Sequence, residues 1–262
     1  MKKKRIIITS LFLITAFLAC NQATQQKAGV NETTAKDVEK IVSSNGGEGC
    51  YIPYQAKVCE LMEKETIAKI LDIDVNQIKV EDAMKTLHEM GKNKDKPYKG
   101  SQYASCQYAW QDKSGKTYKK KINENLSIDM PVGGYVHVGN FSKMKNVQAF
   151  KAMYRNVSQE EMDKAFGEAD KKLQEKGFDH KQIDNAKDLG KGLTAGRNVE
   201  YIEGIGEVAA VITTKMTGEG VELYVLKNGN SFRVSVGIDL KSKAENLEVA
   251  QKIALEVLKK CK

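Results

Sequence analysis

The chain has 262 residues, 41% of them hydrophobic and 29% charged, and a formal net charge of +8 at pH 7. This length predicts one or two domains, and the hydrophobic content suffices for a packed core, which excludes wholesale disorder. No segment repeats with a period of about 20 to 50 residues, so solenoid, coiled-coil and collagen-like chains are excluded. The basic residues at positions 2–5 supply half of the net charge, and the remainder is too weak to indicate a nucleic-acid partner.

Residues 1–19 have the layout of a secretory signal, with basic residues at positions 2–5 and then the apolar stretch Ile6–Ala19. That stretch is shorter than the ~20 residues a helix needs to cross the hydrocarbon core, so a cleaved signal is favoured over a permanent transmembrane helix. The segment Phe17–Cys20 resembles the lipobox of bacterial lipoproteins, in which a small residue precedes a cysteine that is acylated and becomes the mature N-terminus. The resemblance implies lipid attachment at Cys20. The alternative is an ordinary signal that leaves Cys20 as a free thiol.

Residues 20–47 are predicted to form a flexible tether, because Gln, Thr, Lys, Asn, Ser and Gly dominate them. Acyl chains on Cys20, each stabilising membrane binding by ~0.8 kcal/mol per buried CH₂, would anchor the protein permanently. We therefore expect this chain to reside in the cell envelope, held on the membrane by its lipid. We also expect it to bind another envelope protein and not to bind nucleic acid. Asn21, the residue after the expected lipidated cysteine, is not the acidic residue of a retention signal. The expected location is therefore the outer membrane, facing the periplasm.

Four cysteines remain for a compartment in which thiols oxidise: Cys50, Cys59, Cys106 and Cys261. An even number predicts two disulfides, and spacing leaves three connectivities open. We favour Cys59 with Cys106 and Cys50 with Cys261, and the second pair would close a loop of about 210 residues, worth ~4 to 5 kcal/mol in the chain-entropy model. No C-x-x-C occurs, so a zinc site is not expected.

Helices are predicted at both ends of the folded region. Near-helical spacing of apolar residues predicts one helix opening at Cys59 and ending near Leu71, and a second over Val80–Met90 that ends at Gly91. The lysine-rich stretch 91–100 lacks an apolar period and is predicted to be a surface loop. At the other end, Ala244–Lys260 predicts an amphipathic helix that covers one face of a sheet.

Seven segments between these helices are predicted to be strands by their β-branched and aromatic residues. They are Tyr103–Trp110, Leu126–Met130, Tyr135–Val138, Val199–Ile202, Val208–Thr213, Val221–Leu226 and Ser231–Asp239. The dipeptide Asn228–Gly229 predicts a tight hairpin turn between the last two.

The middle of the chain is predicted to be a helical insertion, at about residues 146–190. Apolar spacing predicts a helix from Val147, and Ser158 with Glu161 forms a capping box that opens another helix through Gly177. The glycine-rich stretch 189–196 is predicted to end it. Together the elements predict one α+β domain over residues 48–262, an antiparallel sheet or sheets packed against helices and stapled by disulfides.

Three motifs carry a family resemblance. They are Cys59-Glu-Leu at the opening of a helix, Cys106-Gln-Tyr-Ala-Trp in a strand, and Gly204-Ile-Gly-Glu-Val-Ala before the final hairpin and helix. In this order they resemble bacterial secreted lipoproteins that share a domain of unknown function. The likeness runs from Cys59 to Lys260. The chain differs from the family in having Cys50 and Cys261 and in its helical insertion. It implies an α+β domain and a Cys59–Cys106 bridge, and it assigns no activity.

Motifs for catalysis are scarce. The three histidines, His88, His137 and His180, lie outside any Ser, Cys or carboxylate arrangement for nucleophilic or metal-assisted catalysis. Strand alternation places His137 on the same face as Tyr135, as a half-buried or exposed strand residue. Gly204-Ile-Gly-Glu lacks the third glycine of a phosphate loop and is predicted to be a turn. We expect no cofactor and no metal.

Two surface features are candidates for binding. Three lysines could meet anionic lipid headgroups, with a solvated hairpin face as the alternative; these are Lys119, Lys120 and Lys121. Three aromatic residues near Cys106 could form a platform for sugars or peptides, although aromatics beside a disulfide usually pack against it; these are Tyr103, Tyr108 and Trp110.

The expected function is that of a non-enzymatic, membrane-anchored envelope lipoprotein that binds a partner protein or a small ligand. One alternative is a carrier of an apolar molecule, which requires an internal cavity of ~300 Å³ or more. The other is an envelope hydrolase with a carboxylate pair that spacing does not reveal.

Overall fold

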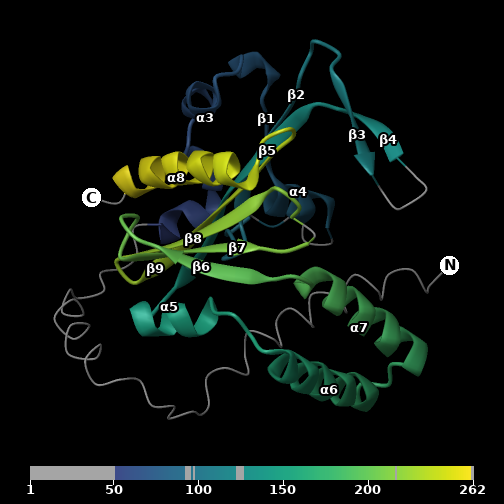
Figure 1. Ribbon diagram of the computed structural model, residues 1–262. Helices are drawn as coiled ribbons and strands as arrows, with labels where there is room; N and C mark the ends of the chain where they lie inside the picture. The colour runs from purple at the N-terminus through teal and green to yellow at the C-terminus, as the bar shows by residue number, and fades with distance from the viewer. Residues whose placement is uncertain (1–50, 92–95, 97, 122–126, 216, 261–262) are drawn as a thin grey trace. The chain divides into compact units, whose positions relative to one another are not determined.

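The computed structural model describes residues 51–91, 96, 98–121, 127–215 and 217–260, and of these it leaves out the side chains of residues 120, 121, 127 and 193 (Figure 1). Cys20, Cys50 and Cys261, with the predicted signal and tether, lie outside the described residues. Within them, helices and an antiparallel sheet are both present, so the chain has the predicted α+β fold. None of the described helices is both long enough and apolar enough to cross a membrane.

Seven of the described strands form one sheet in the order β1-β2-β5-β9-β8-β7-β6. Their bounds are β1 Lys79–Asp82, β2 Ser105–Gln111, β5 Gly133–Lys143, β6 Asn198–Ile202, β7 Val208–Thr213, β8 Val221–Lys227 and β9 Asn230–Ile238. β9 pairs antiparallel with β8 across the predicted turn, where Asn228 and Gly229 both have the positive φ of a tight hairpin. β9 also pairs with β5, which precedes it by about ninety residues, so the centre of the sheet is built from distant parts of the sequence.

Helix α8 (Lys243–Lys259) lies across one face of the sheet and contacts β8 and β9, as predicted for the C-terminal helix (Figure 1). Its buried residues recur every three or four positions, which is the spacing of one helix face; they are Asn246, Val249, Ala250, Ile253, Ala254 and Val257. They share a core with the valines and leucines of β5, β8 and β9 that point to the same side. This face of the sheet is the main hydrophobic core of the domain.

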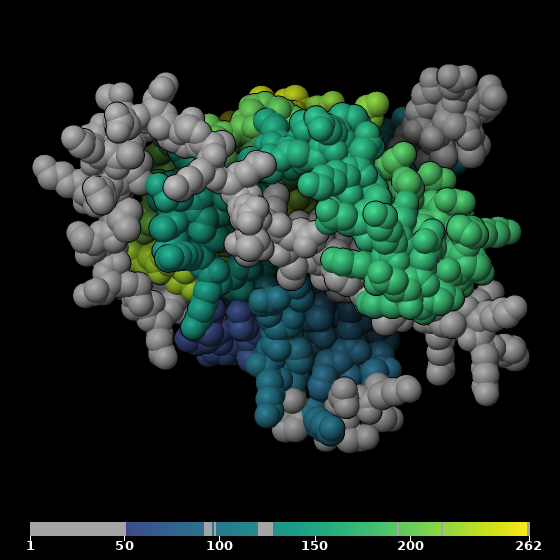
Figure 2. All heavy atoms as spheres, turned by 90° about the horizontal axis from the view of Figure 1, so that it is seen from below, coloured from purple at the N-terminus to yellow at the C-terminus, as the bar shows by residue number. Residues whose placement is uncertain are grey.

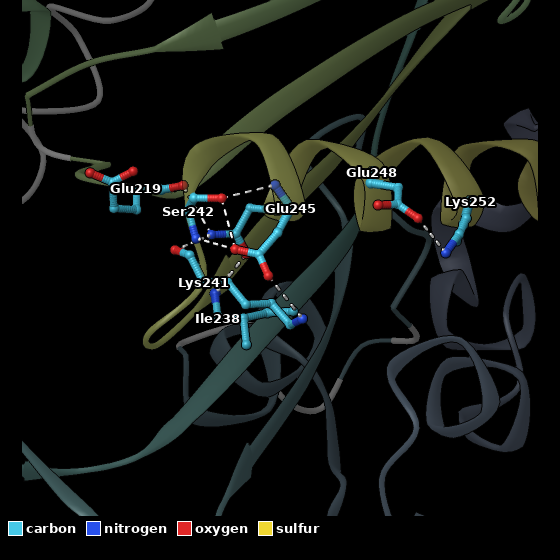
Figure 3. Close-up of polar contacts among 8 residues, drawn as sticks. Glu219, Ile238, Lys241, Ser242, Glu245, Glu248 and Lys252 are labelled. Carbon is cyan, nitrogen blue, oxygen red and sulfur yellow. Dashed lines mark hydrogen bonds and ion pairs between the residues drawn. The ribbon is translucent and has the colours of Figure 1, made fainter.

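A hydrogen-bonded network fixes the start of α8 (Figure 3). Ser242 and Glu245 form a capping box, in which each backbone N–H donates to the other's side chain. In the next turn Asn246 is fully buried. Its Oδ1 accepts a hydrogen bond from Ile238 N at 3.0 Å, and its Nδ2 donates to Glu219 O at 3.0 Å. One side chain thereby joins the helix to the end of β9 and to the loop before β8.

The Cys59–Cys106 disulfide is present and joins a 3-10 turn, Val58–Glu60, to β2. Beside it, Tyr108 and Trp110 are buried in the core, as expected for aromatics near a disulfide, whereas Tyr103 is 52% exposed. The helix predicted to open at Cys59 begins later, because Cys59 lies in that separate turn against β2. The observed helix is α3 (Lys64–Leu71).

The helix predicted over Val80–Met90 is wrong in its first three residues. Lys79–Asp82 is strand β1, which pairs antiparallel with β2. The helix α4 (Ala83–Met90) begins only after Asp82, whose carboxylate accepts hydrogen bonds from the next backbone N–H groups of the helix. A side chain that caps a helix in this way marks its first turn, so the strand ends where the cap begins.

A two-stranded hairpin, β3 (Thr117–Lys121) with β4 (Ser127–Pro131), forms a small sheet of its own. Tyr118 OH donates to Asp239 Oδ1 at 2.7 Å, and Gly133 N donates to Asp239 Oδ2 at 3.0 Å. These bonds tie the hairpin to the ends of β5 and β9. β3 was not among the predicted strands, because three consecutive lysines have low β propensity. The hairpin face expected for this lysine run is nevertheless present, with Lys119 exposed on it.

Residues 148–199 and 214–215 form a compact unit distinct from the rest of the described chain. It contains most of α5 (Val147–Met153) and all of α6 (Gln159–Glu175) and α7 (His180–Thr194). The capping box at Ser158 is confirmed. The glycine-rich stretch predicted to end the insertion lies largely inside α7, where Gly190 lets Phe166 of α6 approach, since a Cβ there would lie 2.8 Å from the ring.

Candidate functional site

Six polar and aromatic side chains gather on the face of the sheet opposite α8. On β5, Val136 and Val138 point into the core, so alternation turns Tyr135 and His137 to the other face. The same alternation on β8 and β9 turns four further residues to that face. We call these residues the sheet-face cluster: Tyr135, His137, Glu222, Tyr224, Arg233 and Ser235. Strand register places His137 opposite Ser235, and Ser235 opposite Glu222.

An ion pair lies at the centre of the sheet-face cluster. Arg233 Nη1 lies 3.1 Å from Glu222 Oε1, and the two side chains are only 21% and 28% exposed. Tyr224 OH donates a second hydrogen bond to Glu222 Oε2 at 3.2 Å. Hydrogen bonds with a charged partner in a partly buried setting are stronger than those of exposed ion pairs. The Glu222 carboxylate is therefore held by both neighbours.

Two aromatic rings of β5 lie on the same face of the sheet as this ion pair. The rings of Tyr135 and His137 have centroids 5.1 Å apart and are tilted. The Tyr135 ring lies against Gly237 of β9, where a Cβ would come within 2.6 Å of a ring carbon. Only glycine at that position leaves room for the ring, and Tyr135 remains 37% exposed. Burial, followed by the nearby Glu222 carboxylate, raises the pKa of the Tyr135 phenol.

His137 is uncharged at neutral pH. Burial, and secondly the positive charge of Arg233, lowers the pKa of its imidazole from 6.5 to about 4. Both effects disfavour the protonated ring. At pH 7 the sheet-face cluster therefore contains one compensated ion pair and otherwise neutral hydrogen-bonding groups.

This low pKa gives the stability of the protein a defined pH dependence. Below pH 6.5 the unfolded chain binds a proton on His137 that the folded chain does not take up until about pH 4. Stability should therefore fall as the pH decreases through this window. The limit set by the pKa difference is about 3 kcal/mol, and the partial exposure of the ring reduces our expectation to about 2 kcal/mol.

Urea denaturation at pH 7.5 and at pH 4.5 measures this effect, with His137→Gln as the comparison. The variant cannot take up the proton, so it should lose less stability than the wild type over the same interval. The other titrating groups are common to both proteins and cancel in the difference. Equal losses in the two proteins would show that His137 titrates normally in the fold.

The row His137, Ser235, Glu222 contains the residue types of a serine hydrolase, but their hydrogen bonds do not form that arrangement. A hydrolytic serine needs a base within hydrogen-bonding reach, and the base needs an acid to orient it. Ser235 Oγ is buried and has no hydrogen-bond partner among the described residues. The carboxylate of Glu222 is bound to Arg233 and Tyr224 instead of His137.

The other predicted site residues are dispersed. Lys119 is exposed on β3 and lies in register with Asp129 on β4. The side chains of Lys120 and Lys121 lie outside the described residues. His88 Nε2 lies 2.7 Å from Lys96 O, far along the chain from His137. In the described part of the chain no three His, Cys, Asp or Glu residues gather as metal ligands.

The sheet-face cluster was missed by reasoning from sequence, apart from the shared face of Tyr135 and His137. Alternation along β8 and β9 was visible in Glu222, Tyr224, Arg233 and Ser235. The pairing of β9 with β5, which brings them beside His137, has no local signal. Comparisons of the chain with protein-family models, curated proteins and solved structures give no match, so no relative assigns a role to these residues.

Proposed function

We propose that this protein is a bacterial envelope lipoprotein, anchored through Cys20, whose folded domain is a non-enzymatic binding module. The signal layout of residues 1–19 and the lipobox resemblance of Phe17–Cys20 support the anchor. The described fold begins with Tyr51, which is fully buried. A flexible chain of the intervening length has a root-mean-square reach of about 30 Å, enough to hold the domain just above the membrane surface.

The sheet-face cluster supports binding as the activity of the domain. The observation that carries this is that the Glu222 carboxylate is bound to Arg233 and Tyr224, so that no acid among the described residues is shown to orient His137. The cluster nevertheless presents two aromatic rings with hydrogen-bonding tips, Tyr135 and His137. Rings with polar tips are enriched where proteins contact partners. We propose that a polar partner in the envelope binds here.

The anchor is tested by Cys20→Ala in the full chain with its signal intact. The wild-type protein should sediment with membranes and be released only by detergent. The variant should be released as a water-soluble envelope protein, because the acyl chains are lost. Gln22→Ala is the matched control and should remain membrane-bound. A variant that sediments like the wild type would contradict lipid anchoring.

The same cells also show which membrane holds the protein and which side of that membrane the domain faces. We propose the outer membrane, facing the periplasm. The protein should then co-fractionate with outer-membrane markers and resist protease added to intact cells. Digestion in intact cells would place it on the outside instead.

The recognition surface is tested by placing a photoreactive phenylalanine analogue at position 135 or, as a matched control, at position 103. Both positions hold exposed tyrosines, and Tyr103 lies outside the sheet-face cluster. Irradiation of intact cells should give a discrete crosslinked product from position 135 that position 103 does not give, and Arg233→Met should diminish it. Identical products from both positions, or none from position 135, would contradict this surface.

A further inference from the structure

The unit that contains α6 and α7 has a pocket of its own (Figure 2 shows these helices in green). Its volume is about 290 Å³. The start of α6, the end of α7 and the turn that follows α7 supply its lining, which consists of Val157, Gln159, Met162, Phe166, Lys191, Thr194, Ala195, Gly196 and Arg197. All of these residues belong to the same unit.

Local contacts give the pocket fixed walls. The close approach of Phe166 to Gly190 sets the spacing of α6 and α7. The turn after α7 is held by Lys215 N, which donates to Ala195 O at 2.9 Å. Arg197 Nη1 donates to Arg155 O at 3.1 Å, which positions the guanidinium at the pocket. The walls are therefore formed before any ligand arrives, and a preformed site costs less to fill.

The charge of the lining selects an anion. Of the nine described residues that line the pocket, Lys191 and Arg197 are cationic and none is acidic. Two acids near the start of α6 already have partners, since Glu161 is paired with Arg155 at 2.7 Å and Asp163 accepts a hydrogen bond from Gln159 at 3.0 Å. The N-terminal end of α6 borders the pocket at Gln159 and carries partial positive charge, whereas the C-terminal end of α7 borders it at Thr194 and carries partial negative charge, so the two helix ends oppose each other. The preference for a negatively charged group therefore rests on the side chains of Lys191 and Arg197.

The remaining lining selects a short apolar body. Val157, Met162 and the buried ring of Phe166 offer hydrocarbon surface. At about 30 Å³ for each water-sized group, the pocket holds about ten non-hydrogen atoms. A sugar phosphate would leave this apolar surface without an apolar partner, and a full-length lipid chain would be too large for the pocket.

We propose that this pocket binds a small amphipathic carboxylate, with the carboxylate at Lys191 and Arg197 and a medium-length hydrocarbon chain against Met162 and Phe166. This goes beyond the anchored binding module proposed above and uses none of the residues of the sheet-face cluster. It also does not depend on lipid at Cys20, so the two proposals fail separately.

Isothermal titration of octanoate into the mature full chain carrying Cys20→Ala tests the proposal. We expect one saturable site with a dissociation constant on the order of 0.1 mM. Acetate, which lacks the chain, and octanol, which lacks the charge, should each bind at least about tenfold more weakly, since a charge-assisted hydrogen bond is worth about that factor or more. Absence of saturable octanoate binding, or equal binding of octanoate and octanol, would overturn it.

Variants locate the site. Lys191→Met removes one cation from an exposed side chain and should weaken octanoate binding about tenfold. Lys181→Met is the matched control on the exposed face of α7 and should bind like the wild type. Met162→Trp should fill the pocket and abolish binding, with circular dichroism confirming that the variant folds. An unchanged affinity in Lys191→Met, or an equal loss of affinity in Lys181→Met, would show that octanoate does not bind in this pocket.

Discussion

Replacing both Cys59 and Cys106 with alanine is expected to lower the free energy of unfolding by about 4 kcal/mol. The bridge joins residues separated by 47 positions. Opening a loop of that length restores conformational freedom to the unfolded chain, and the chain-entropy model assigns this about 4 kcal/mol. Cys106 is also fully buried in β2, so the loss acts at the centre of the core.

Urea denaturation followed by the fluorescence of Trp110, the only tryptophan in the chain, measures this loss. The reduced wild type should unfold at a similarly low urea concentration. Reductant should further destabilise the double variant only if a second bridge exists, which tests the predicted pairing of Cys50 with Cys261. A loss below about 1 kcal/mol would fall outside the range of a stabilising disulfide and would contradict the bridge.

Asn246→Leu is expected to destabilise the domain by about 3 kcal/mol, because each buried backbone group left without a partner costs about 1–3 kcal/mol. The asparagine amide is the partner of Ile238 N and Glu219 O, and it also lies 3.4 Å from Lys241 O. Leucine has nearly the same volume but can neither accept nor donate, so the packing changes little while the hydrogen bonds are lost.

The matched control for this variant is Glu248→Leu on the exposed side of α8. Glu248 makes an exposed ion pair with Lys252 (Figure 3), and loss of such a pair costs about 0.5 kcal/mol or less. Urea midpoints of the two variants separate the buried amide from a general effect of leucine on the helix. Equal midpoints in both variants would contradict a structural role for the Asn246 amide.

Local signals predicted the elements whose ends are decided within the chain segment itself. The capping box at Ser158 opens a helix, and Asn228–Gly229 forms the tight turn. Each depends on residues within three or four positions, so no distant contact is needed. The Cys59–Cys106 bridge was also predicted, with help from a family resemblance in its motifs.

The pairing of distant strands, and some elements that depend on it, were not predicted. β1 pairs with the edge of β2, and three of its four residues were predicted to start a helix because their local sequence carries no sign of that distant pairing. The glycine-rich stretch was predicted to end the helix because glycine has a low helix propensity. α7 instead continues through Gly190, where the missing Cβ leaves room for the ring of Phe166. The sheet-face cluster depends on β9 lying between β5 and β8, which is a property of the whole sheet.

The intact mass of the protein purified from the bacterial envelope tests most directly whether Cys20 carries a lipid anchor. We predict a chain that begins at Cys20 and is heavier than its amino-acid sequence by the mass of a diacylglyceryl group, with or without a further acyl chain. Hydroxylamine or base should remove the ester-linked chains, and Cys20→Ala should abolish the addition. A mass that matches unmodified protein, or a chain that keeps residues 1–19, would contradict the account.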